Sequence, residues 1–160
     1  MEPNPYAPPR ASVADVADGK VAPALWNPNA AASWSLLLSP AFGAILHLKN
    51  WQRLGEPGKA ATSRIWAIVT VALLAVVIVA SVLLPEAKAL DAVSRVVGLA
   101  LLLGWYFSIG RSQAAYVHAR YGKGYPRRGW TKPLLLALLA FIAFIGLAIG
   151  IALVVAPAVD

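Results

Sequence analysis

Few side chains in this 160-residue chain could do acid–base or metal chemistry. It has two histidines, His47 and His118, and no cysteine. A metal site or a Ser-His-acid arrangement would need further ligands or a carboxylate, and no Asp or Glu lies near either histidine in sequence. We therefore expect both histidines to be interfacial polar residues, and we predict no catalytic residue, no metal site and no cofactor.

Two other stretches could bind phosphate or nucleic acid. Residues 55–59 read GEPGK, which lacks the spacing and the Lys-Ser/Thr ending of a phosphate loop. Residues 116–130 interleave aromatic and basic side chains, a pattern that can bind RNA. Beside a membrane the same pattern favours anionic lipid, at ~1 kcal/mol per basic side chain. We predict no nucleic-acid partner, and lipid contact through Arg111, Arg120, Lys123, Arg127, Arg128 and Lys132.

Two uncharged segments decide where these residues must lie. Ile65 to Leu84 and Leu134 to Val155 contain no charged side chain. As helices rising 1.5 Å per residue, each reaches roughly the 30 Å of a bilayer's hydrocarbon core. The whole chain is 59% hydrophobic and 13% charged. These features predict an integral membrane protein whose first partner is the lipid bilayer.

Two further segments, 30–48 and 90–109, complete a predicted set of four spans with 65–84 and 134–155. The predicted fold is therefore all-α, a polytopic membrane protein with four transmembrane helices arranged as two helical hairpins in a bundle. The first span is the least apolar, and Pro40 should kink it because proline removes a backbone hydrogen bond. A re-entrant or interfacial helix is the alternative for that segment.

Short sequence signals predict where the tail ends and where the helices begin and end. Residues 1–25 are rich in proline and form a predicted flexible tail, ahead of a transmembrane domain over 26–160. Asn27 is a good N-cap and Pro28 suits the first helical position, so a helix should start there. Gly55 and Gly122 should end helices, and the third helix should continue beyond the membrane up to Gly122.

Basic residues are distributed unevenly around the predicted spans. Residues 49–64 and 111–132 hold ten of the 14 Lys and Arg residues. The positive-inside rule places both connections in the cytoplasm, which for a bacterial protein means the inner membrane. With four spans both termini are then periplasmic. If 30–48 is re-entrant instead, the N-terminus moves to the cytoplasm.

Small residues recur along the predicted spans at spacings that let helix backbones approach closely. Predicted helix-packing positions are Ser35, Ser39, Gly43, Gly104, Ser108, Gly146 and Gly150.

Four short motifs lie in the first helical region: Leu25-Trp26-Asn27-Pro28, Trp34-Ser35-Leu36-Leu37, Ser39-Pro40-Ala41-Phe42-Gly43 and Asn50-Trp51. This series resembles that of small uncharacterised four-helix inner-membrane proteins of proteobacteria. The resemblance covers residues 25–70 and implies no activity.

Two functions from different classes remain open at the level of sequence. The first is a non-enzymatic membrane protein that acts by contact with another membrane component or by self-association. Examples are an immunity protein against a membrane-inserting toxin and an accessory subunit of a membrane complex. The alternative is a small oligomeric transporter or channel, which would need a polar path that only a few Ser and Thr side chains could line.

Overall fold

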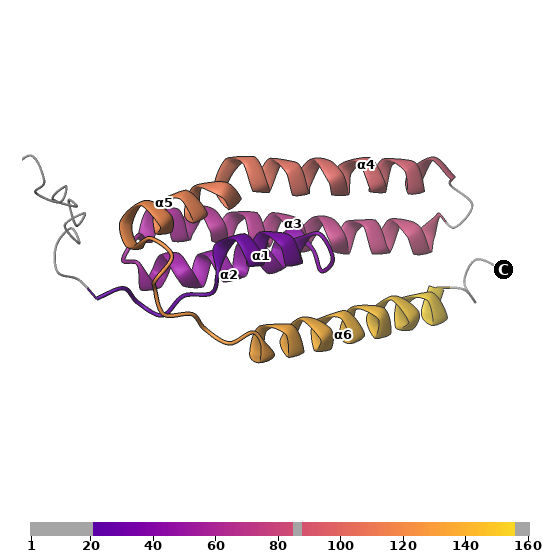
Figure 1. Cartoon of the computed structure of the whole chain (residues 1–160). Coiled ribbons are helices and arrows are strands. Elements are labelled where there is room, and N and C mark those ends of the chain that lie inside the picture. The colour runs from indigo at the N-terminus through magenta and orange to yellow at the C-terminus, as the bar shows by residue number, and fades with distance from the viewer. Residues whose placement is uncertain (1–20, 85–87, 156–160) are drawn as a thin grey trace, which may run out of the picture.

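The computed structural model describes residues 21–84 and 88–155, and every regular element in them is helical apart from one isolated β-bridge. Most of the predicted tail therefore lies outside the described residues. The elements are α1 (Pro28–Ser35), α2 (Pro40–Arg53), α3 (Pro57–Leu83), α4 (Lys88–Trp105), the π-helical turn η1 (Tyr106–Gly110), α5 (Arg111–Tyr121) and α6 (Thr131–Val155) (Figure 1).

Three of the helical segments are long and apolar enough to cross a membrane. They are Pro57–Leu83, Ala89–Tyr121 and Thr131–Val154. Two of them contain the uncharged stretches of the sequence, and the third joins α4, η1 and α5 into one continuous rod. The predicted continuation of the third helix up to Gly122 is thus confirmed. The prediction of four membrane-length helices is not confirmed.

The predicted span 30–48 is a helical hairpin, α1–α2, rather than one kinked helix. The helix stops at Ser35, residues 36–39 form a turn, and Pro40 begins a second helix. Proline cannot donate the hydrogen bond that would continue α1, and its ring would clash with the carbonyl of residue 36. Ser39 takes φ 151°, a conformation that side-chain-bearing residues rarely adopt, so the turn holds local strain.

The hairpin returns the chain to the end where it started. In Figure 1, α2 runs back beside α1 to the end of the bundle at which α3 begins. Trp26, Ala31 and Leu46 form a buried apolar cluster between the two arms. Leu36 and Leu37, in the turn, are 69% and 78% exposed. The hairpin thus has an apolar tip and a base that carries the polar residues.

The predicted helix boundaries at Asn27, Gly55 and Gly122 are confirmed. Asn27 Oδ1 accepts hydrogen bonds from the backbone N–H groups of Asn29 and Ala30, at 3.1 and 3.5 Å. Gly55 and Gly122 follow α2 and α5 with φ of 72° and 62°, values that glycine adopts without a Cβ clash.

Both connections rich in basic residues lie at one end of the molecule, which we call the basic end: residues 49–64 and 111–132. The described chain also starts there, because Leu25 and Arg127 form a parallel β-bridge. Leu25 thus lies at the same end as the basic connections, whereas the predicted arrangement put both termini opposite them. The hairpin is the reason, since it replaces a crossing with a return. α6 leads away from this end and finishes at the opposite one (Figure 1).

The hairpin, α3 and α4 meet where the side chain of Trp105 fills the space between them. Trp105 is fully buried and packs with Ala44 and Ala67. A Cβ built on Gly43 would lie 2.5 Å from a carbon of the Trp105 ring and closer still to Ser35 Oγ. No side chain larger than hydrogen fits at position 43 without moving a neighbour.

We predict that Gly43→Ala lowers the free energy of unfolding by ~1–3 kcal/mol, because the added methyl displaces Ser35 or the Trp105 ring. Thermal unfolding of the purified chain in mild detergent measures this. Gly98→Ala is the matched control: nothing lies within 4 Å of its Cβ position, so helix propensity should leave that variant as stable as wild type or stabler. Equal stability of the two variants would contradict the packing described above.

Candidate functional site at the basic end

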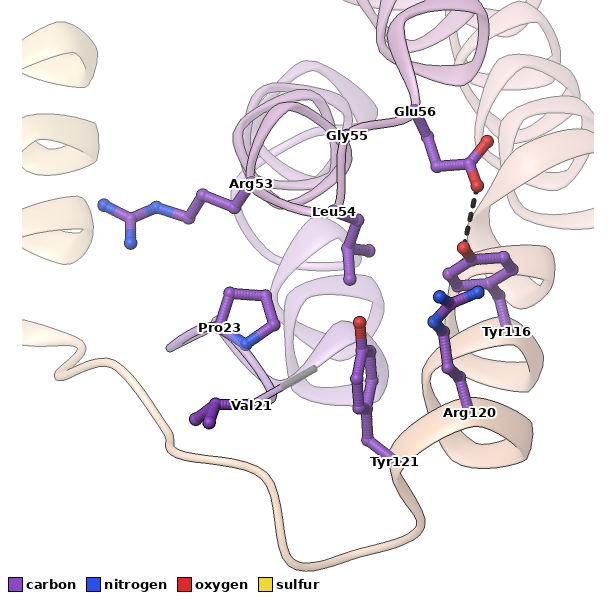
Figure 2. Close-up of a pocket in the computed structure, with 9 residues that line it drawn as sticks. All are labelled: Val21, Pro23, Arg53, Leu54, Gly55, Glu56, Tyr116, Arg120 and Tyr121. Carbon is purple, nitrogen blue, oxygen red and sulfur yellow. Dashed lines mark hydrogen bonds between the residues drawn. The ribbon is translucent and has the colours of Figure 1, made fainter. Parts of the chain in front are cut away.

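A pocket of about 500 Å³ opens at the basic end of the molecule (Figure 2). It lies between the chain before α1, the turn from α2 to α3, and the last turns of α5. Its lining combines charged, aromatic and aliphatic side chains: Val21, Pro23, Arg53, Leu54, Gly55, Glu56, Tyr116, Arg120 and Tyr121.

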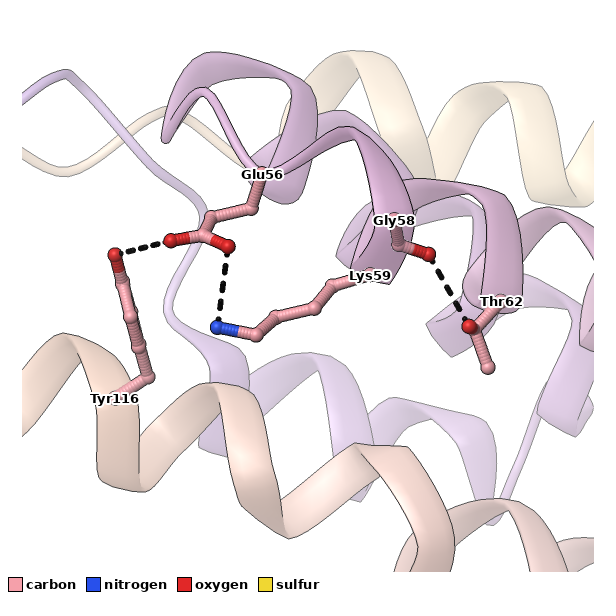
Figure 3. Close-up of polar contacts among 5 residues, drawn as sticks. All are labelled: Glu56, Gly58, Lys59, Thr62 and Tyr116. Atoms are coloured by element: carbon pink, nitrogen blue, oxygen red, sulfur yellow. Dashed lines mark hydrogen bonds and ion pairs between the residues drawn. The ribbon is translucent and has the colours of Figure 1, made fainter.

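Glu56 is the one carboxylate among the described residues that line the pocket, and its interactions are internal. Tyr116 donates its hydroxyl proton to Glu56 Oε1 at 2.7 Å, and Lys59 Nζ lies 3.2 Å from Oε2 (Figure 3). The same ammonium sits 4.3 Å from the centroid of the Tyr116 ring and 4.9 Å from that of Trp51. The Tyr116 hydrogen bond, followed by Lys59, lowers the pKa of Glu56. Glu56 is thus an ionised group that fastens α5 to the start of α3, rather than a general acid.

Arg53 points away from this carboxylate, whereas the charge of Arg120, beside Tyr116, contributes to lowering the pKa of Glu56. Figure 2 shows Arg53 on the far side of Leu54 and Gly55 from Glu56. Its Nη1 donates to the carbonyl oxygen of Ala24 at 3.4 Å. Arg120 lies beside Tyr116, and its guanidinium is 6.0 Å from the centroid of the Tyr121 ring. The pocket therefore presents positive charge and aromatic surface, which suit an anionic group.

Behind the pocket, Asn50 is the centre of a buried hydrogen-bond network. Its Oδ1 accepts from the Trp26 N–H at 3.1 Å, and its Nδ2 donates to the Trp26 carbonyl at 2.8 Å. The same Nδ2 donates to Gln113 Oε1 at 3.0 Å, and Gln113 Nε2 donates to the His47 carbonyl at 2.9 Å. Asn50, Gln113 and His47 are fully buried. The network joins the chain before α1, the helix α2 and the helix α5.

The sequence analysis did not identify Asn50 or Gln113. The signal that could have indicated them is a carboxamide near an aromatic residue in each of two helices, Asn50 beside Trp51 and Gln113 three residues before Tyr116. Buried carboxamides require partners, but sequence alone does not say which ones they find.

The two histidines do not meet. His118 is exposed on α5, whereas His47 is fully buried. Its Nε2 lies 3.3 Å from the Pro28 carbonyl oxygen, and its ring is 5.4 Å from the Trp105 ring. No group of three or more potential metal ligands occurs among the described residues.

The predicted packing positions differ in their surroundings, and Ser39 lies in the turn between α1 and α2. Ser35 and Gly43 meet across the α1–α2 hairpin, and a Cβ on Gly104 would lie 3.2 Å from the Trp66 ring. Ser108 bonds its own helix, donating to the Trp105 carbonyl at 3.2 Å. On α6 nothing lies within 4 Å of a Cβ at either Gly146 or Gly150.

Four of the six residues predicted to contact lipid hold their guanidinium groups over aromatic rings. These pairs are Arg111 with Phe107, Arg120 with Tyr121, Arg127 with Tyr125, and Arg128 with Trp26. The other two residues, Lys123 and Lys132, are exposed. All six lie at the basic end, where lipid headgroups would surround a membrane-embedded bundle.

Comparison of the chain with protein-family models, with curated proteins and with solved structures finds no match.

We predict that Asn50→Ala and Gln113→Ala each lower the free energy of unfolding by about 1–3 kcal/mol, because each leaves a buried polar partner unsatisfied. The double variant should lose less than the sum of the two, since the residues bond each other. Thermal or denaturant unfolding in detergent tests this, with Gln52→Ala on the exposed face of α2 as the control. Additive losses at Asn50 and Gln113 would mean that they act independently.

Proposed function

We propose that this chain is a non-enzymatic integral membrane protein that acts by contact with another membrane protein through α6. The observation that carries the proposal is the exposure of α6 along most of its length. This helix follows residues 122–130 and runs beside α3, below the other helices in Figure 1. Among the described residues of α6, only Pro133, in its first turn, is buried.

α6 is apolar around its whole circumference, and one of its faces is hollowed. The glycines Gly146 and Gly150 lie at the centre of a shallow apolar groove of about 400 Å³, which Leu147, Ile151 and Val154 complete. A groove of this kind admits the backbone of a second transmembrane helix. We assign it one occupant, a transmembrane helix of another protein, which fits an immunity protein or an accessory subunit.

The polar groups of the bundle support a contact role over catalysis. Asn50 and Gln113 bond each other and the backbone, and the carboxylate of Glu56 is held by Tyr116 and Lys59. A membrane enzyme that works by acid–base or nucleophilic catalysis would need a free acid, base or nucleophile that faces a cavity. The pocket at the basic end offers cations and phenols, which suit binding.

We further propose that the basic end faces the cytoplasm of a bacterial inner membrane. The ten Lys and Arg residues of 49–64 and 111–132 support this orientation through the positive-inside rule. With three crossings and a re-entrant hairpin, residue 21 is then cytoplasmic and the end of α6 periplasmic. This arrangement matches the alternative topology for residues 30–48.

A small oligomeric channel or transporter is the second candidate. The observation that favours it is the hairpin itself, because re-entrant backbone inside a membrane is tolerated where it is buried in protein or lines a water-filled cavity. Beside it, His47 Nδ1 and Trp105 Nε1 are buried without a hydrogen-bond partner. Saturable solute flux into liposomes that contain only this protein would support the channel and count against the contact role.

For the contact role, we predict that a photo-crosslinking amino acid at Leu147, in the groove, forms a defined adduct with one membrane protein in cells. The same probe at Ile145, which is also exposed but lies on the opposite side of α6, should label mainly lipid. Gly150→Ile should abolish the Leu147 adduct by filling the groove. Equal protein adducts from both positions, or adducts with a second copy of this chain alone, would contradict the proposed occupant.

For the orientation, we predict that cysteines placed singly at Lys59 and Arg127 resist an impermeant maleimide in intact cells and react after permeabilisation. The chain has no native cysteine to interfere. A cysteine that replaces Val21 should behave like these two, because residues 21–27 lie at the basic end. Labelling of position 21 in intact cells would restore the four-span topology.

A further inference from the structure

Two arginines from distant parts of the chain contact the short segment Ala24–Trp26. Arg53, in the last turn of α2, donates from Nη1 to the Ala24 carbonyl at 3.4 Å. Arg128, in the connection before α6, holds its guanidinium 3.9 Å from the centroid of the Trp26 ring. The two anchor residues are two positions apart, so they are separated by roughly 7 Å of backbone at most.

The segment Ala24–Trp26 is itself held firmly. The Leu25 N–H donates to the Pro126 carbonyl at 3.0 Å, and the Arg128 N–H donates to the Leu25 carbonyl at 2.9 Å. Trp26 donates its indole Nε1–H to the Gly129 carbonyl at 3.0 Å and bonds Asn50 through its backbone. Both guanidinium groups therefore extend from a rigid platform rather than from loose loops.

These two like charges are close, and among the described residues no carboxylate lies between them. Partial burial, followed by the positive charge of Arg53, lowers the pKa of Arg128. The acidic side chains of the described residues are Glu56 and Asp91. Glu56 is bonded to Tyr116 and Lys59, and Asp91 lies near the start of α4, at the other end of the bundle. Two adjacent guanidinium groups that these carboxylates do not neutralise are a binding site for an anion.

The surroundings place this pair at the depth of lipid headgroups. Trp26 packs with Trp130, and Arg128 precedes the start of the membrane-length helix α6 by three residues. Tyr125 lies beside Arg127 in the same connection. Trp and Tyr are enriched at the membrane–water interface, where one end of the side chain is apolar and the other is hydrated.

We propose that Arg53 and Arg128 form a specific binding site for the phosphate of an anionic lipid headgroup. Each guanidinium can donate two parallel N–H bonds to phosphate oxygens, and two such groups on one platform satisfy most of the phosphate's acceptors. The bound phosphate would also relieve the repulsion between the arginines. The site depends on membrane insertion but not on any protein partner of α6, so the two proposals fail independently.

The test measures the affinity of phosphatidylglycerol for the full-length protein by native mass spectrometry from detergent. R53Q/R128Q should bind the lipid at least about tenfold more weakly than wild type, since two guanidinium contacts are lost. K49Q/R64Q removes the same charge from two exposed side chains at the same end and should change the affinity by less than about threefold. An equal loss in both variants would mean a diffuse charge effect and would overturn the proposal.

Two further measurements test whether the site needs the guanidinium groups and whether it binds a lipid or a free anion. R53K/R128K retains the charge and the fold but loses the planar fork, and it should also weaken binding several-fold. Wild-type affinity in this variant would overturn the proposal even if R53Q/R128Q did not fold. Inorganic phosphate, added to the protein in zwitterionic nanodiscs, should not raise its thermal unfolding midpoint, whereas added phosphatidylglycerol should. Stabilisation by inorganic phosphate alone would assign the site to a free anion instead of a lipid.

Discussion

The carboxamide of Asn50 is the interaction on which the rest of the bundle depends. It makes two hydrogen bonds to the backbone of Trp26 and one to Gln113, so a single buried side chain fixes the chain before α1 and the helix α5 against α2. In an apolar environment each of these groups would be costly to leave unpaired. The return of the hairpin to the basic end therefore depends on the hydrogen bonds between Asn50 and the Trp26 backbone.

Close packing along the hairpin follows from that attachment. Once Trp26 is fixed beside Asn50, α1 lies along α2 with Ser35 against Gly43, and the Trp105 side chain fills the remaining space. At the same level α4 passes into the π-helical turn η1, whose extra residue per turn changes which side chains face the hairpin. Trp105, just before this turn, and Gly110, its last residue, are both buried. The third long helix is thus shaped by the hairpin that it covers.

The parts of this fold that sequence could predict are those decided locally. Asn27 with Pro28, Gly55 and Gly122 set helix ends through capping and backbone preference, which depend on a few neighbouring residues. Uninterrupted apolar composition likewise predicts the long helices at 65–84 and 134–155. In both cases the physical cause lies within the segment that shows the signal.

The hairpin and the arginine pair could not be predicted in this way, because their causes are distant contacts. Residues 30–48 have the composition of a modest span, and Pro40 is compatible with either a kink or a reversal. The reversal is stabilised by hydrogen bonds from Asn50 to Trp26 and to Gln113, which lie 24 and 63 positions away from it in the sequence. In the same way Arg53 and Arg128 are far apart in sequence and meet only through Ala24–Trp26.

The molecule consists of two parts that differ in how closely they pack. The α1–α2 hairpin, α3 and the α4–α5 rod are joined by hydrogen bonds of Asn50, Gln113 and Glu56 and share the buried cluster around Trp105. α6 contacts α3 but buries little of its own surface, and residues 125–129 attach its start to the segment that contains Leu25 and Trp26. A helix anchored at one end and exposed along most of its length keeps a fixed direction while much of its surface stays open. That combination suits recognition of another transmembrane helix, because the anchor sets the register in which Gly146 and Gly150 are presented.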